Sequence, residues 1–429
     1  MLATVESEAK LARASPQKWT MLQCWGFRVV FIYFILDALP DLLLRLPGGP
    51  SVLGVYWHTW NAVLPWFGAH VLRVPDPQRL VLPISPVLLG DFAGAYVLML
   101  VFLLLALIVG TIWTIADPHR ADHRTLHGWL RVYVRYALAF SMLGYGISKL
   151  FQVQFRPLDL VDLMTPFGML QPRELLWNYM GFSRTYQIFT GVVECLGVAL
   201  LFFRRTTLLG ALVLAGSLAN VLVIDIAYGV AVRRIALRLL LMALVLAAAD
   251  WRRLANLFVL HGPAAPVNVD GPSWQNPWAR RTAIAVKAIV ILGVIASRSM
   301  ELYHERTFVI AARAELYGVF SVQRMVRDGR EVAAEDSHSW NWIAVDGRSI
   351  AIGFTGTEWE RRRAEFDDAH QTITLGSARQ GPQPKNTLTY SRDGDNVIMS
   401  GVLDGQETKI VLRRMPEPRF VLQDATRSR

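Results

Sequence analysis

Four ionisable residues of this sequence lie inside long apolar runs, where a charged group is costly. Lys149 closes the run RVYVRYALAFSMLGYGISK, and Glu194 lies within FTGVVECLGVALLFF. The next two apolar runs contain Asp225 and Arg238. Charged side chains within a membrane segment usually face a partner or a water-filled cavity, and an isolated buried carboxylate takes up a proton instead of staying charged. We therefore expect pairing between the two bases and the two acids.

This polar cluster has two interpretations. Ion pairs between neighbouring helices would hold the register of a bundle, or the cluster would line a functional pocket. Tyr145 lies one turn before Lys149 on the same helical face, Ser148 precedes that lysine, and Asn220 adds an amide. A tyrosine–lysine pair can polarise a quinone carbonyl or bind a lipid phosphate. Otherwise Tyr145 is an aromatic residue of the membrane interface.

Other polar residues flank the apolar runs. Asp91 immediately precedes the run 92–116, where an acid is expected to cap the start of the helix. The first run contains two further candidates for the same cavity, Asp37 and Asp41. A basic loop carries three histidines at a spacing of four residues, which a metal site on a helix would also show: His119, His123 and His127. We favour the basic loop.

The composition is that of a membrane protein. Of 429 residues, 53% are hydrophobic and 18% charged, against about 25% charged in soluble domains. The run 93–116 has no charged residue and exceeds the roughly 20 residues that cross a bilayer. The net charge of +10 comes mostly from basic residues beside apolar runs. Basic residues in such positions determine the orientation of membrane helices. The expected partner is therefore the lipid bilayer, and no nucleic acid is expected.

We predict seven membrane spans, at about 24–46, 92–116, 128–151, 183–203, 206–227, 232–249 and 279–301. Proline at position 40 should kink or end the first span. The tryptophan-rich segment 55–73 and the segment 250–262 are each typical of a helix that lies in the membrane interface. A short helix is expected within the connector 152–182.

Lysine and arginine counts predict the orientation. Basic residues are concentrated in four segments, at 10–18, 120–131, 204–205 and 252–281. Such segments usually face the cytoplasm, so we expect a protein of the bacterial inner membrane whose N-terminus is cytoplasmic. Arg233 and Arg234 break this pattern, because they would lie outside. Everything after the last span would be outside as well.

From residue 305 the sequence shows short runs in which apolar and polar residues alternate, separated by Asp-Gly pairs. This pattern is typical of β-hairpins. The expected fold is an α-helical polytopic membrane bundle with a C-terminal antiparallel all-β domain, a barrel or sandwich, outside the membrane. The predicted segments are 1–22 (cytoplasmic), 23–127 (first membrane part), 128–262 (four-helix core), 263–304 (linker and last helix) and 305–429 (β-domain).

The stretch 128–250 resembles the DoxX-like membrane proteins, which share a superfamily with the membrane domain of vitamin K-dependent γ-carboxylases and HTTM proteins. The resemblance rests on GYGISKLF, with Gly146 and Lys149, on VVECLGVALLFFRRT, with Glu194, and on the two apolar runs that follow. In carboxylase relatives the lysine acts as a base toward a reduced quinone, which implies that role for Lys149. DoxX-like relatives are linked to quinone-dependent sulfur oxidation and redox stress.

Together these observations predict a protein that binds a quinone or other lipid-soluble ligand in the outer half of the bundle. Lys149 and Glu194 would be its catalytic anchors, lined by Tyr145, Asp225 and Arg238. As an enzyme it would be a quinone-linked oxidoreductase or a subunit of one, needing a redox partner protein because no flavin, haem or metal motif is present. The alternatives are a scaffold whose β-domain recruits a partner, and a transporter of small solutes or lipids.

Overall fold

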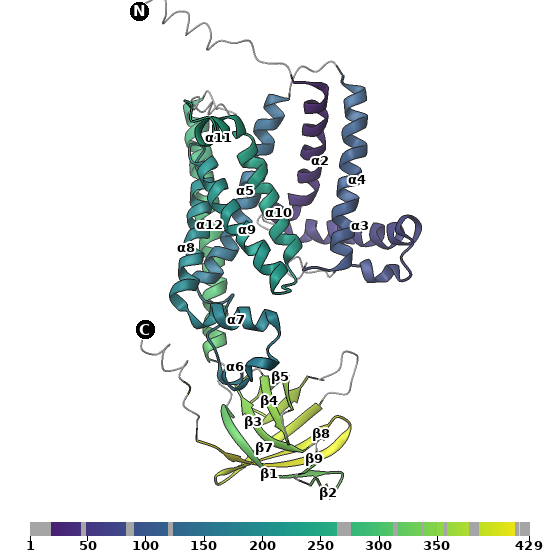
Figure 1. Ribbon diagram of the computed structural model, residues 1–429, viewed down its shortest axis with the longest axis vertical. Coiled ribbons are helices and arrows are strands. Elements are labelled where there is room, and N and C mark those ends of the chain that lie inside the picture. Colours follow the sequence, from purple (N-terminus) through teal and green to yellow (C-terminus); the bar gives the residue numbers. More distant parts are fainter. Residues whose placement is uncertain are drawn as a thin grey trace, which may run out of the picture. The chain divides into compact units, whose positions relative to one another are not determined.

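The computed structural model describes residues 19–43, 49–82, 90–118, 123–263, 276–311 and 316–416, with short gaps at 334, 337–338, 348, 356–357 and 377–385, and residue 420. The chain forms two compact units. Unit 1 comprises residues 1–147 and 191–298, and unit 2 comprises 148–190 and 299–429 (Figure 1). This division differs from the predicted segments, because the connector after Ile147 belongs with the β-domain.

Helices make up the described part of unit 1. Their bounds are α2 Met21–Leu43, α3 Gly49–Phe67, α4 Ala93–Ala116, α5 Arg124–Leu150, α8 Arg184–Leu201, α9 Thr207–Ala227, α10 Arg233–Ala248, α11 Trp251–Phe258 and α12 Pro277–Ala311. Helices α5, α8 and α12 extend past the boundary of the unit. All seven predicted spans are helices, with ends that mostly lie within a few residues of the prediction.

Four of these helices are long and apolar enough to cross a membrane: α2, α4, α9 and α12. For α5, α8 and α10 the helix is confirmed, and the crossing stays a prediction. Helix α3 runs across the ends of α2 and α4 (Figure 1), as expected of an interfacial segment. Leu53, Trp57 and Leu64 on α3 are buried against α4 in one apolar cluster.

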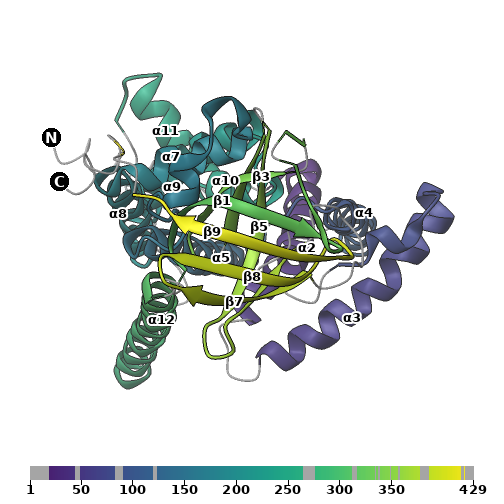
Figure 2. The same cartoon turned by 90° about the horizontal axis from the view of Figure 1, so that it is seen from below.

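Unit 2 contains a closed antiparallel barrel. Its strands are β1 Gly318–Arg327, β2 Arg330–Glu331, β3 Trp340–Val345, β4 Ser349–Phe354, β5 Trp359–Asp367, β6 Thr372–Leu375, β7 Asn386–Asp393, β8 Asn396–Leu403 and β9 Gln406–Arg414. Each strand from β3 onward pairs with the next, and β1 pairs with both β3 and β9, which closes eight strands into a barrel (Figure 2). The short β2 pairs antiparallel with the end of β1 and is not part of the closed ring. The predicted all-β domain is confirmed as a barrel.

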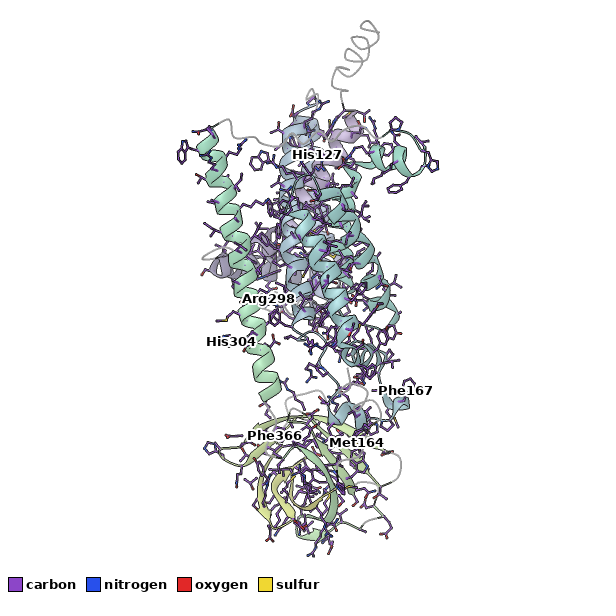
Figure 3. All side chains as sticks on the ribbon, turned by 90° about the vertical axis from the view of Figure 1, so that its left-hand side faces the viewer. His127, Met164, Phe167, Arg298, His304 and Phe366 are labelled. Carbon is purple, nitrogen blue, oxygen red and sulfur yellow. The ribbon has the colours of Figure 1, made fainter. Side chains whose placement is uncertain are left out.

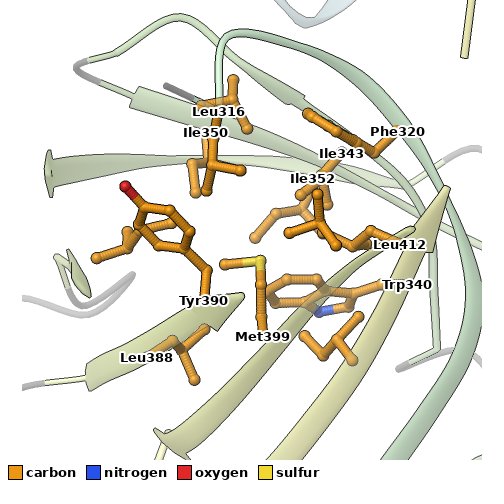
Figure 4. Close-up of a cluster of buried hydrophobic side chains, with 14 of the residues drawn as sticks. Leu316, Phe320, Trp340, Ile343, Ile350, Ile352, Leu388, Tyr390, Met399 and Leu412 are labelled. Carbon is orange, nitrogen blue, oxygen red and sulfur yellow. The ribbon is translucent and has the colours of Figure 1, made fainter. Parts of the chain in front are cut away.

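The predicted Asp-Gly hairpins explain the tight strand connections. Asp328 and Gly329 join β1 to β2 with φ of 47° and 74°, and Asp404 and Gly405 join β8 to β9 with φ of 52° and 85°. Two consecutive residues with positive φ form the type I′ turn, which matches the twist of paired strands. Alternate residues fill the barrel with apolar side chains, including Trp340, Ile352, Tyr390 and Met399 (Figure 4).

A short helix of the connector, α6 Leu160–Met164, packs on this barrel. Leu160 and Val161 are buried with Ala344 of β3 and Ala351 of β4. Asp162 accepts a hydrogen bond at 2.8 Å from Arg361 of β5. The second connector helix, α7 Pro172–Phe182, confirms the short helix expected there.

Asp159 caps α6 and lies in an acidic environment. It and Asp162 form a reciprocal capping box. Burial, together with the charges of Asp162 and Asp346, raises the pKa of Asp159 to about 8. This carboxyl group is therefore neutral over much of the ordinary pH range.

Candidate functional site

The candidate site is built around a proline in α2. Pro40 lies within the helix, and because proline has no N–H, the carbonyl of Leu36 one turn earlier loses its helical donor. The hydroxyl of Tyr56 on α3 donates to this carbonyl at 3.1 Å. A side chain thus replaces the missing hydrogen bond, as is required where no water is available.

The carbonyls on either side are also bound by side chains. The hydroxyl of Tyr133 on α5 donates to Ile35 at 3.0 Å, and Nη1 of Arg238 on α10 donates to the carbonyl of Asp37 at 3.3 Å. Three helices therefore bind one turn of α2. The helix continues beyond Pro40 to Leu43, so the proline does not end the span, and the predicted kink stays a prediction.

A polar cavity of about 70 Å³ lies beside this turn. Nη1 of Arg238 lies 3.9 Å from Oδ2 of Asp37, and both side chains are nearly inaccessible to solvent. Arg234 lies one turn before Arg238 and also lines the cavity. The remaining walls are mostly apolar: Pro40, Tyr56, Trp57, Ala95, Leu98, Phe102 and Ile235.

Among the described residues that line the cavity, hydrogen-bond donors outnumber acceptors. Arg234 and Arg238 each carry five N–H groups, and one carboxylate, Asp37, lies among the lining residues. Trp57 is only 4% exposed, and within the described residues its indole N–H has no acceptor. A buried N–H without a partner costs about 1–3 kcal/mol. The arrangement suits a ligand that brings acceptor oxygens.

Asp91 joins α4 to α10. Its carboxylate accepts from the backbone N–H groups of Arg233 and Arg234 at 3.2 and 3.0 Å, and from Nε of Arg233 at 2.7 Å. Burial alone would raise the pKa of Asp91, but these hydrogen bonds lower it below the usual value. The expectation that Asp91 caps its own span was wrong, because the residue that precedes α4 is Phe92 and Asp91 caps α10 instead.

The predicted site residues lie in different environments. Four of them are buried: Lys149, Glu194, Asp225 and Ser148. The hydroxyl of Ser148 donates to Oε1 of Gln154 just after the helix, at 3.2 Å. Tyr145 is 36% exposed, which fits an interfacial aromatic. Asn220 is exposed on α9, and its role in binding a ligand stays a prediction.

The structure also bears on the predicted pairing. Arg238 forms an ion pair with Asp37, an acid from the first helix that the predicted pairs did not include. The pairing of Lys149 or Arg238 with Glu194 or Asp225 stays a prediction. The candidate role of Asp37 at the cavity is thereby supported, and the side chain of Asp41 lies outside the described residues. Helices α5 and α8 are in close contact near Glu194. A Cβ atom built on Gly146 of α5 would lie 2.7 Å from Sγ of Cys195, the residue that follows Glu194 on α8. This glycine is the one in the segment GYGISKLF.

Sequence reasoning missed the roles of Arg234, Tyr56 and Trp57. A signal for Arg234 was present, because it and Arg233 break the charge pattern that otherwise predicts topology. The structure gives each of these two arginines a place: Arg233 forms an ion pair with Asp91, and Arg234 lines the cavity.

A second buried base lies near the other end of α2. Nε of Arg28 donates to Nε2 of His123 at 3.0 Å, and Nη2 donates to the carbonyl of Asp117 at 2.9 Å. His123 is thus part of a buried hydrogen-bond network, His127 is partly buried, and His119 lies outside the described residues.

Comparisons with known proteins show a distant similarity. The chain is 28% identical over 124 residues to an uncharacterised protein of Bacillus subtilis, YwoB, a match that covers 29% of this chain and 79% of YwoB. No family model and no solved structure matches.

Proposed function

We propose that the bundle of unit 1 binds the oxygen-bearing head of a lipid-soluble ligand, such as a quinone, in the cavity beside Pro40. The observation that carries this proposal is the buried indole N–H of Trp57, which lacks an acceptor within the described residues. Arg234 and Arg238 line the same cavity, and a carbonyl oxygen would accept from such donors. The ligand stabilises the site by supplying the acceptor that the described protein atoms do not.

The size of the cavity limits what it holds. Each water occupies about 30 Å³ in the liquid, so 70 Å³ admits the oxygen-bearing edge of a ring. The rest of the ligand extends away from the site among the apolar side chains. In the predicted orientation, with a cytoplasmic N-terminus in a bacterial inner membrane, the cavity lies in the outer half of the bilayer and the barrel lies outside.

The resemblance to DoxX-like proteins adds a redox form of this proposal. In that form a partner protein would deliver the electrons, and the resemblance implies that Lys149 and Glu194 handle protons. Both side chains are buried, but neither is among the described residues that line the cavity beside Pro40, so their role stays a prediction from the resemblance alone. Asp225 is buried as well.

The test is binding of ubiquinone-1 to the detergent-solubilised protein, measured by equilibrium dialysis with chromatographic quantification. Trp57→Phe removes the N–H and keeps an aromatic ring. A buried hydrogen bond contributes about 0.5–1.5 kcal/mol, so Trp57→Phe should weaken binding about 2- to 10-fold. Trp66→Phe is the matched control, because Trp66 lies on the same helix and is 58% exposed. Equal binding by both folded variants would overturn the proposal.

A further inference from the structure

A second and much larger cavity lies at the other end of unit 1. It has a volume of about 710 Å³ and opens where α2 and α5 begin and α10 ends. His127, labelled near one end of the bundle in Figure 3, is among its lining residues. This volume lies within the roughly 300–1,000 Å³ of typical ligand sites.

One part of the wall is apolar and aromatic. It is formed by Phe27 and Val30 of α2, Leu130 of α5 and Val245 of α10. The rings of Trp19 and Phe27 meet edge to face, with centroids 5.5 Å apart, and the ring of His127 lies about 6 Å from both. Such a wall holds a hydrocarbon chain, and a small hydrophilic anion would leave it uncovered.

The other part of the wall is basic. Among the described residues that line the cavity, three are arginines, Arg124, Arg131 and Arg252, and none is an acid. A carboxylate outside the lining, Asp250, is 3.0 Å from Arg131 but also 3.0 Å from Arg253. The described lining itself therefore contributes three positively charged side chains and no negatively charged one.

We propose that this cavity binds one anionic phospholipid, with its phosphate among the arginines and an acyl chain along the apolar wall. The charge of the lining selects an anion, and the aromatic wall selects an amphiphile over a soluble phosphate. The cavity lies at the basic ends of the helices, where anionic lipids of a bilayer concentrate. This site is separate from the cavity beside Pro40 and stands independently of the function proposed above.

A glycine makes the proposal testable without removing charge. Gly26 lines the cavity, and a Cβ built on it would meet no atom within 4 Å. A leucine there extends into the space that the lipid would occupy, and leucine also favours a helix over glycine. Gly54 of α3 is equally open and does not line the cavity, so Gly54→Leu is the matched control.

The experiment is native mass spectrometry of the full chain titrated with dioleoyl phosphatidylglycerol in detergent. Dioleoyl phosphatidylcholine and glycerol phosphate serve as probes that lack the net charge and the chains, respectively. We expect phosphatidylglycerol to bind at least tenfold more tightly than phosphatidylcholine, and glycerol phosphate not to displace it. Gly26→Leu should reduce binding at least tenfold, and Gly54→Leu should leave it unchanged.

A charge variant gives a second test that does not depend on the folding of Gly26→Leu. The double variant Arg124→Gln/Arg252→Gln should weaken binding at least tenfold. Arg280→Gln/Arg281→Gln, which removes the same charge from exposed residues of α12, should not. The proposal is overturned by equal binding of the two phospholipids, by displacement with glycerol phosphate, or by charge variants that bind as the wild type does.

Discussion

The hydrogen bond between Tyr56 and α2 should depend on Pro40. Tyr56→Phe leaves the Leu36 carbonyl, now bound at 3.1 Å, without a donor, which should reduce the free energy of unfolding by about 1–3 kcal/mol. In a Pro40→Ala background the new N–H of residue 40 can bond to that carbonyl, because it lies four residues earlier. The same Tyr56→Phe change should then cost less than about 1 kcal/mol, which corresponds to a coupling of roughly 1–2 kcal/mol.

The coupling is measured with a double-mutant cycle. The wild type, both single variants and the double variant are unfolded with sodium dodecyl sulfate in mixed micelles, and tryptophan fluorescence follows the transition. Tyr133→Phe is the control, because its hydroxyl donates to Ile35, a carbonyl whose helical donor is not residue 40. Additive effects of Pro40→Ala and Tyr56→Phe would refute the replacement of a helical hydrogen bond by Tyr56. Coupling of the same size with Tyr133→Phe would show that the proline acts through general distortion.

Three further predictions concern stability. Asp91→Ala should reduce the free energy of unfolding by about 1–2 kcal/mol. Because the pKa of Asp91 is lowered in the folded protein, the stability that Asp91 contributes is present above about pH 4 and is lost in acid. Asp76→Ala, at an exposed pair, should change stability by under about 1 kcal/mol, and an equal loss at both sites would contradict the cap. The folded pKa of Asp159 is raised to about 8, so its contribution is complete below about pH 4 and lost as pH rises through 8. Asp159→Asn keeps the cap and should flatten the pH dependence of thermal unfolding of the barrel between about pH 5 and 9, followed by circular dichroism; an unchanged slope would assign that dependence to other groups. Gly94→Ala should reduce the unfolding free energy by about 1–3 kcal/mol, because its Cβ would collide with the Leu80 carbonyl, whereas Gly54→Ala should be neutral or stabilising in the same fluorescence assay.

Local sequence patterns predicted most of the secondary structure. Helix ends follow from apolar runs and their charged borders, as in α4, and the barrel turns follow from Asp-Gly pairs such as Asp404 and Gly405. These signals work because each involves residues close together in the chain. Strand count and closure were left open, since pairing of β1 with β9 joins segments far apart in sequence.

The candidate site was predicted only in part for the same reason. The sequence did not predict the ion pair between Arg238 and Asp37, because Asp37 lies about 200 residues earlier in the chain. No local pattern distinguishes Trp57 from the other tryptophans of α3, because its role comes from burial against α4 and the cavity. Arg234 had a visible signal in the topology rule that it breaks.

The packing of α6 on the barrel has a consequence for biosynthesis. Leu160 and Val161 leave the ribosome long before the barrel that covers them is complete, since β3 and β4 follow much later in the chain and closure needs β9, which ends at Arg414. At about 5–20 residues per second the delay is on the order of tens of seconds. During that interval Leu160 and Val161 are not yet buried against the barrel. A nascent chain stalled before β9 should therefore be cleaved by protease in this connector more readily than the completed protein.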